Sequence, residues 1–238
     1  GGVFAPVQLG RSADAVRAVA QSYNHAIDGL QRRFAVQRCL AEIDRLLLEA
    51  EELEQVLEPI LVRVRELTGA QAAAVALVDR DAPAHARSFV VGADSAHCPI
   101  SRVHIDEEAG LKLRESPQAF MVPSNHLDRY PFLEPLHDAG AYSCYVWPVI
   151  VAERIAAIVS VGFGAEAPAT QSQQELGAEC AARLQTALSN AERGERLYRQ
   201  AHFDSLTSLP NRLLFHDRLS QELKNAIDNA QRSALLYI

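Results

Sequence analysis

The stretch HFDSLTSLPNR carries side chains whose types and spacing could do chemistry. Asp204, Thr207 and Asn211 stand three and four residues apart. Their oxygen atoms can accept hydrogen bonds from free backbone N–H groups where a helix ends. Pro210 followed by Asn211 is typical of a sharp turn, and a new helix is expected to start at Arg212. The stretch therefore predicts either a plain helix–turn–helix or a coupling turn that transmits rotation of the first helix to a following domain.

A second group of side chains could line a pocket for a small molecule. Ligand pockets are lined mainly by apolar and aromatic groups. Such residues gather in the middle of the chain: Phe89, Phe120, Tyr130, Phe132, Tyr142, Cys144 and Trp147. The alternative is that each of them only fills a hydrophobic core, which is the commoner role of an aromatic side chain.

Composition narrows the classes of partner. The formal net charge is −7 over 238 residues, which disfavours nucleic acid because phosphate binding draws on clustered Lys and Arg. The four cysteines have no C-x-x-C spacing, so we expect neither a metal site nor a disulfide framework. No apolar run reaches the roughly 18 residues that span a bilayer. We expect this chain to lie in the cytoplasm without touching a membrane.

Long helices must position these residues from both ends of the chain. Apolar residues recur at helical spacing from residue 12 to 50 and again from residue 172 onward. This pattern predicts one long helix or two helices in tandem at the first end and a long helix at the other. A narrow apolar stripe on so long a helix favours burial against a second copy, as in a two-stranded coiled coil. We therefore predict a homodimer through these two stalk helices, and packing within one chain is the alternative.

Between the stalk helices the pattern changes from helix to strand. A helix is predicted from Leu53, and Thr68 followed by Gly69 is a typical C-terminal stop. Short β-rich runs follow at 72–79 and 86–93, which predicts a hairpin or two adjacent strands.

The clearest hairpin is predicted at 142–164, where Pro148 implies an edge strand or a bulge. The segment before it, 94–141, is irregular in pattern, with short helices expected after Asp106 and within 126–140.

This order of elements resembles a GAF domain, a small-molecule-sensing fold. The resemblance rests on a helix that ends in Thr-Gly-Ala, the run AAAVALVD, the hairpin YSCYVWPVIVAERIAAIVSVGF and a helix that contains LQTALSNAERGERLY. It implies an α+β fold (an α/β sandwich) with a central antiparallel sheet flanked by helices. It also implies a pocket for an unknown ligand between the sheet and the irregular segment. A GAF unit that binds no ligand and serves as a dimer spacer is the alternative.

The opening stretch resembles the start of the GGDEF domain of diguanylate cyclases, which begins D-x-L-T-x-L-P-N-R-x-x-F. The matching residues are Asp204, Leu206, Thr207, Leu209, Pro210, Asn211, Arg212 and Phe215, whereas Ser208 stands where that family usually has Gly. In the family the first metal-binding Asp follows an apolar strand, here expected at 234–238. The resemblance thus implies that GTP and Mg are bound by residues beyond this chain, and we expect no catalytic residue within it.

The N-terminal part resembles the last helix of a HAMP module, which carries signals from transmembrane helices into the cytoplasm. The resemblance rests on ADAVRAVAQSYNHAIDGLQRRFAVQRCLAEIDR, preceded by VFAPVQLG as the end of a connector. We therefore expect a HAMP-like helix at 1–50, a GAF-like domain at 51–191, a linker helix at 192–203 and a truncated GGDEF start at 204–238.

Together these features predict a regulatory sensor fragment of a bacterial cyclic di-GMP signalling protein. The parent is expected to be a diguanylate cyclase anchored in the inner membrane, and the ligand would act by changing the packing of the stalk helices. It can shift that packing only by its difference in affinity for the two arrangements. One alternative is a non-catalytic dimerisation or scaffold module. Another is a sensor for a phosphodiesterase domain that follows the GGDEF domain.

Overall fold

The structure is a computed structural model. It describes residues 14–50, 52–93, 98–116, 119–164, 169–229, 232 and 234. The chain divides into two compact units, residues 1–187 and 188–238. The expected HAMP connector and nearly all of the expected strand at 234–238 lie outside the described residues.

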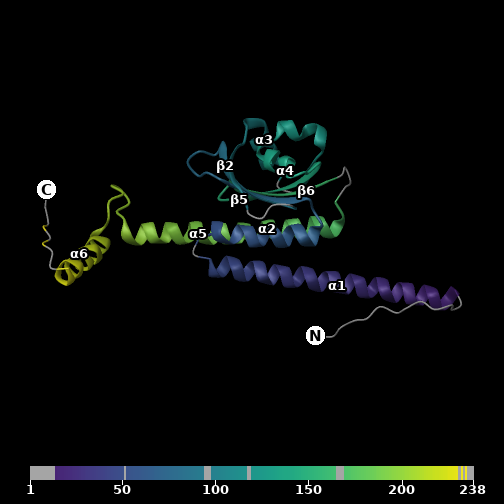
Figure 1. Ribbon diagram of the computed structural model, residues 1–238. Coiled ribbons are helices and arrows are strands. Elements are labelled where there is room, and N and C mark those ends of the chain that lie inside the picture. Colours follow the sequence, from purple (N-terminus) through teal and green to yellow (C-terminus); the bar gives the residue numbers. More distant parts are fainter. Residues whose placement is uncertain are drawn as a thin grey trace. The chain divides into compact units, whose positions relative to one another are not determined.

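A six-stranded antiparallel sheet forms the centre of the first unit (Figure 1). Its strands are β1 (Ala72–Val78), β2 (His85–Gly92), β3 (Ile100–His104), β4 (Phe120–Val122), β5 (Ser143–Val151) and β6 (Arg154–Phe163), in the order β3-β2-β1-β6-β5-β4. The two hairpins predicted from sequence, β1–β2 and β5–β6, are confirmed. The two edge strands, β3 and β4, were not predicted, because they fall in the segment whose pattern is irregular.

A two-residue turn and a bulge shape the β5–β6 hairpin. Ala152 and Glu153 have φ angles of 48° and 62°, and a two-residue turn of type I′ requires positive φ at both positions. The register shifts between Val149 and Ile150, directly after Pro148. A proline has no N–H to give to the ladder, so the bulge expected at this point is confirmed.

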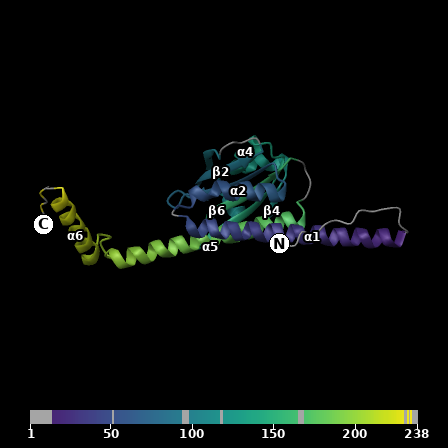
Figure 2. The ribbon, with the colours of Figure 1, turned by 60° about the horizontal axis from the view of Figure 1, so that its bottom comes forward.

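Helices cover both faces of the sheet, as Figures 1 and 2 show. One face carries α2 (Glu54–Thr68) and the first half of α5 (Gln171–His202); the other carries α3 (Glu107–Glu115), α4 (Glu134–Asp138) and the 3₁₀ helices Ser124–Arg129 and Pro131–Leu133. An apolar core lies between the sheet and this second layer, with Phe132, Leu133 and Leu136 almost wholly buried. The predicted α+β fold with a central antiparallel sheet and flanking helices is confirmed.

A polar bridge joins the end of α2 to the start of α5. α2 stops at Gly69, whose φ of 64° suits a left-handed helix cap. Gln173 Oε1 accepts a hydrogen bond from Thr170 N at 2.7 Å, and Gln173 N donates to Thr170 Oγ1 at 3.4 Å, which is a capping box. Gln173 Nε2 also donates to the carbonyl oxygen of Thr68 at 2.6 Å. One glutamine side chain therefore connects the two helices.

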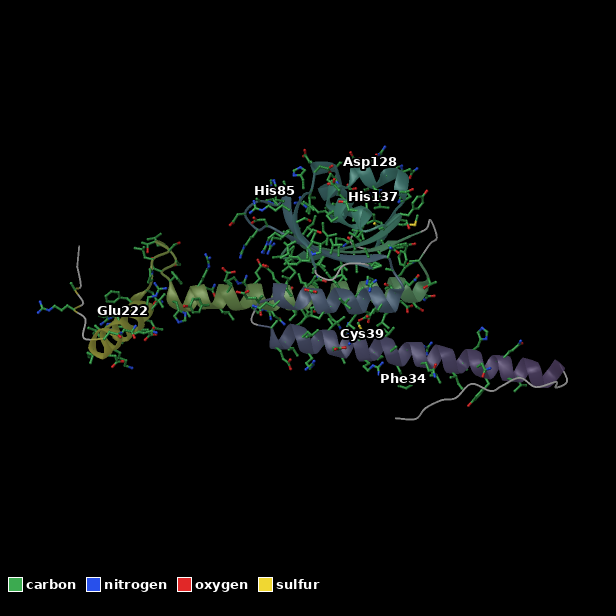
Figure 3. All side chains as sticks on the ribbon, viewed as in Figure 1. Phe34, Cys39, His85, Asp128, His137 and Glu222 are labelled. Carbon is green, nitrogen blue, oxygen red and sulfur yellow. The ribbon has the colours of Figure 1, made fainter. Side chains whose placement is uncertain are left out.

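α1 (Asp14–Glu49) is a single long helix with two dissimilar sides. Leu40 and Ile43 are buried where α1 packs on α2, and Asp44 forms an ion pair with Arg183 of α5 at 2.9 Å. Figure 3 shows Cys39 on the side of α1 that faces α2 and Phe34 on the opposite side. Packing within the chain thus accounts for the C-terminal part of the predicted apolar stripe.

The second unit contains the end of α5, a turn, and α6 (Arg212–Asp228). The helix predicted from Arg212 is confirmed, and Asn211 is its N-terminal cap. No helix within the described part of the chain is long and apolar enough to cross a membrane.

Candidate functional site

The turn after α5 is organised by the carboxylate of Asp204. Its Oδ1 accepts hydrogen bonds from Leu206 N at 3.1 Å, Thr207 N at 2.9 Å and Thr207 Oγ1 at 2.9 Å. The backbone closes the same turn, because Ser208 N donates to the carbonyl oxygen of Asp204 at 2.9 Å. These bonds favour the charged carboxylate, so the pKa of Asp204 is lowered, chiefly by the Thr207 N–H and hydroxyl.

Asn211 connects the two helices that flank this turn. Its Oδ1 accepts from Leu214 N at 3.0 Å in the first turn of α6, and its Nδ2 donates to the carbonyl oxygen of Ala201 at 2.8 Å near the end of α5. Asn211 N also donates to the carbonyl oxygen of His202 at 2.8 Å, and Pro210 forms a β-bridge with Phe203. Arg212 is the first residue of α6. Of the five residues singled out from sequence, four therefore lie in one turn, and the fifth, Arg212, begins the helix that follows it.

The expected pocket residues fall into three groups. Phe132 and Cys144 belong to the apolar core between the sheet and α4, and Phe120 and Tyr130 pack against it. The ring centroids of Tyr130 lie 6.0 Å from Phe120 and 5.9 Å from Phe132. Burial raises the pKa of the Cys144 thiol to about 12, so this thiol stays protonated at neutral pH. This group alone lies where the expected pocket should be.

Phe89 and Trp147 lie on the opposite face of the sheet. Strand pairing places Trp147, Val159, Val75 and Phe89 in one row across β5, β6, β1 and β2. Residues in one such row point to the same side of a sheet, and this row faces α2 and α5. Tyr142, just before β5, is half exposed. These three side chains do not share a cavity with the first group.

The sheet surface beneath the core is built from small residues. Ala72, Ala74 and Ala76 of β1 are buried there, together with Ser88 of β2. Ser88 pairs directly with Ser101 of β3, and neither buried hydroxyl has a hydrogen-bond partner among the described residues. A buried hydroxyl without a partner is costly, so this pair is the part of the surface that a polar ligand group would stabilise.

A cleft of about 470 Å³ opens at one end of the same layer. It lies between the β1–β2 turn, α3 and the start of β6, and its floor includes Val78, Ile105 and Ile155. Each of these three structures contributes one arginine to the rim, Arg80, Arg114 and Arg154, beside the carboxylates Asp79, Asp106 and Glu107. The cleft offers both signs of charge above an apolar floor.

Two family models match the chain. The model described as "GAF domain" matches residues 52–188, which is more than half of the chain and includes the whole sheet. The chain belongs to the GAF domain family. The model described as "Diguanylate cyclase, GGDEF domain" matches residues 201–238.

Solved GAF domains share this fold. One is the phycoerythrobilin-bound GAF domain from a cyanobacterial phytochrome, which is 12% identical, has a TM-score of 0.56 and aligns over 68% of this chain and 99% of that one. Another is the GAF domain from a phosphoenolpyruvate-protein phosphotransferase of Coxiella burnetii, 16% identical, with a TM-score of 0.55 over 68% of this chain and 98% of that one. At such low identity the likeness establishes the fold and nothing about the ligand.

Two curated proteins match a shorter stretch of this chain. Diguanylate cyclase TpbB from two strains of Pseudomonas aeruginosa is 52% identical over 42 residues, which make up 18% of this chain. The match covers only 10% of the length of either relative. The two family matches place a GAF sequence before a GGDEF sequence along this chain.

Sequence reasoning missed the two serines of the GAF core and the charged cleft. No metal-binding group of three or more His, Cys, Asp and Glu side chains exists in the described part of the chain. Ser88 and Ser101 come together only through the pairing of β2 with β3, and β3 carries no clear strand pattern. The arginines of the cleft come from a turn, a helix and a strand that are far apart in sequence, so no local motif could have indicated them.

Proposed function

We propose that this chain is the regulatory part of a cyclic di-GMP signalling protein, in which the GAF domain controls a diguanylate cyclase domain. The observation that supports this most directly is the continuity of α5, a single helix from Gln171 to His202. It begins in the region that matches the GAF family and ends inside the region that matches the GGDEF domain. A rigid helix can carry a rotation between two domains, and the turn of Asp204 and Asn211 would receive it.

The catalytic chemistry is assigned to residues that follow this chain. GTP and Mg are bound there in the proposed protein, and this chain supplies no catalytic group. Its contribution is a homodimer through the stalk helices, which brings two cyclase domains, each with one GTP, into or out of contact. We place this assembly in the cytoplasm.

The ligand site of the GAF domain is proposed between the sheet and the layer of α3 and α4. Phe120, Tyr130, Phe132 and Cys144 supply its apolar lining, and the hydroxyls of Ser88 and Ser101 supply polar groups without partners. A small molecule that satisfies these hydroxyls would gain free energy from bonds that the unliganded core lacks.

The control role can be tested in the full-length protein by insertions into α5 after Gly194. One added residue rotates everything that follows by about 100°, whereas seven added residues nearly preserve the helical phase. We expect the single insertion to change cyclic di-GMP formation from GTP at least about fivefold and the seven-residue insertion to change it less than about twofold. Equal rates from both variants and the unaltered protein would refute control through α5.

A second candidate is a GAF domain that binds no ligand and serves as a dimer spacer. One observation favours it: Phe132, Leu133 and Leu136 fill the layer above the sheet and are each at most 1% exposed. Native mass spectrometry and an absorption spectrum of freshly purified protein separate the two candidates. A retained small molecule supports the sensor, and a clean protein mass that no added nucleotide or metabolite stabilises against heat supports the spacer.

A further inference from the structure

Strand β5 touches the apolar core with one face and helix α5 with the other. Successive side chains of a strand point to opposite sides. Cys144 and Val146 point into the core beneath α4, and both are fully buried. Tyr145 and Trp147 point the other way, toward α5, with ring centroids 6.1 Å apart. β5 is therefore in direct contact with both the proposed ligand site and the proposed output helix.

Three contacts join β5 to α5 along its first half. Ala169 N, two residues before α5, donates to the hydroxyl oxygen of Tyr145 at 3.1 Å. Gln185 Nε2 donates to the carbonyl oxygen of Ile150 at 2.7 Å. Between them the ring of Trp147 packs against Gly177 so closely that a Cβ atom there would clash with Cη2, Cζ2 and Cε2 of the indole. Glycine is the only residue that permits this approach.

The position of Trp147 against Gly177 leaves one bond unmade. The indole Nε1 is buried and has no hydrogen-bond partner among the described residues. Trp147 as a whole is only 5% exposed. A buried donor without a partner destabilises the arrangement that holds it there. A second position of the indole that gave Nε1 a partner would therefore be close in free energy.

Space for such a second position lies beside the ring. A groove of about 420 Å³ runs between β5 and α5, and Trp147 forms part of its wall. Gln174 and Gln185 line it with side-chain amides. The other lining residues from α5 include three alanines, whose small side chains leave the groove open: Ala178, Ala181 and Ala182. Gln174 Nε2 and Gln185 Nε2 are already bonded to backbone carbonyl oxygens, at 2.9 Å and 2.7 Å, so the Oε1 atoms of these two glutamines are suited to accept the indole N–H.

We propose that β5 couples the core face of the sheet to α5, with Trp147 as the positioning residue that moves between Gly177 and the adjoining groove. A change beside Cys144 and Val146 shifts β5, the indole leaves or regains its contact with Gly177, and the first half of α5 shifts with it. The regulatory meaning of this movement rests on the function proposed above, in which α5 is the output helix. The movement itself requires neither a ligand nor a cyclase domain.

The test uses two matched substitutions in the core of this chain. Val146→Ala removes two methyl groups from β5, and Val90→Ala removes two methyl groups from β2, the strand that contacts α2. Both valine side chains are almost fully buried in the core on the same face of the sheet. Amide hydrogen exchange is compared for residues 174–187 of α5 and for α2. We expect Val146→Ala to speed exchange in α5 at least about threefold relative to α2, and Val90→Ala to act on α2 instead.

Trp147→Phe distinguishes a positioning role from simple packing. In the Trp147→Phe background, Val146→Ala should lose its specific effect on α5, because the side chain that transmits it is gone. Purely structural packing would give two independent effects that add. Additive effects, or equal responses of α5 and α2 to both valine substitutions, would overturn the proposal.

The fluorescence of the chain's only tryptophan gives an independent readout. Gly177→Ala forces the indole from its contact, so its emission should move to longer wavelength, whereas Gly194→Ala in the same helix meets no atom within 4 Å and should leave the emission unchanged. Unchanged emission in a folded Gly177→Ala variant would also contradict the proposal. If circular dichroism shows that Gly177→Ala does not fold, the exchange comparison decides alone. Because all these variants are studied without ligand or GTP, their outcome is separate from that of the insertion experiment.

Discussion

At the scale of single residues, Asp204 is the side chain whose charge holds the turn after α5. Its pKa is lowered by the N–H and hydroxyl of Thr207 and by the N–H of Leu206. A carboxyl group with a lowered pKa in the fold stabilises it above the pKa of the unfolded chain. That contribution is lost as the pH falls through the lower pKa of the folded turn.

We therefore expect the turn to open in acid below about pH 4 while the sheet stays folded. The amide signals of Leu206 and Thr207, followed by NMR from neutral to acid pH, should move together with the titration of Asp204. Asp204→Asn should remove this pH dependence, since its side chain carries no charge at any pH. An unchanged acid transition in Asp204→Asn would assign the opening to another group.

Ser208 supplies a second prediction in the same turn. Positive φ angles among the described non-glycine residues occur at Ala152, Glu153 and Ser208, and that of Ser208 is 57°. This conformation is costly for a residue with a Cβ atom, and glycine would avoid that cost. Ser208→Gly should stabilise the closed turn by about 0.5–1 kcal/mol, after the entropy cost of glycine in the unfolded chain.

Hydrogen exchange of the Asp204 amide, which donates to the carbonyl oxygen of Leu209 at 2.8 Å, measures that gain. Ser205→Gly is the matched control, because Ser205 has no positive φ to relieve and should become slightly less stable. Faster exchange in Ser208→Gly would show that the left-handed conformation is not strained.

At the scale of the elements, the bridge made by Gln173 joins α2 to α5. Gln173→Ala removes half of a capping box and also the bond to the carbonyl oxygen of Thr68. We expect a loss of about 1–2 kcal/mol in the free energy of unfolding, measured with urea. Gln171→Ala, which removes only an exposed bond to Glu175 one helical turn away, should cost less than about 0.5 kcal/mol. Equal losses would mean that the bridge adds nothing beyond helix propensity.

Local signals explain which elements could be predicted from sequence. Gly69 marks the end of α2 and Pro148 marks the bulge of β5, because each acts through its own backbone. The turn residues Asp204 and Asn211 are local in the same sense, since their partners lie within about ten residues of them. The hairpins and long helices follow from periodicity, which is also a property of neighbouring residues.

The expected pocket depended on information that is not local. Phe89 and Trp147 were grouped with Phe132 because all are aromatic, but a shift of one residue along a strand moves a side chain to the other face. Only the pairing of β5, β6, β1 and β2 shows which side each of them occupies. The pairing of Ser88 with Ser101 could not be predicted from the sequence for the same reason.

At the scale of the whole molecule, α1 leaves an apolar stripe exposed. Val19, Tyr23, Leu30 and Phe34 are between 42% and 69% exposed, and their four- and seven-residue steps keep them within about 60° of one another around the helix. Cys39 faces α2 from the opposite side (Figure 3). Four apolar side chains that are this exposed on one side of a helix form the kind of surface that two parallel helices bury in a dimer.

Phe34→Glu tests whether this stripe joins two copies of the chain. We expect the unaltered protein to sediment as a dimer, and the charged side chain to weaken that dimer at least about tenfold, because a carboxylate would have to be buried without a partner. Gln21→Glu adds the same charge at an exposed position about 140° away around the helix, and should leave the dimer intact. Circular dichroism must show the same helix content in both variants, since the substitution acts on association rather than on folding. If the unaltered protein is a monomer at every concentration, the stripe is ruled out as a dimer interface. Equal weakening by both substitutions would instead point to general charge repulsion between chains that each carry a net charge of −7.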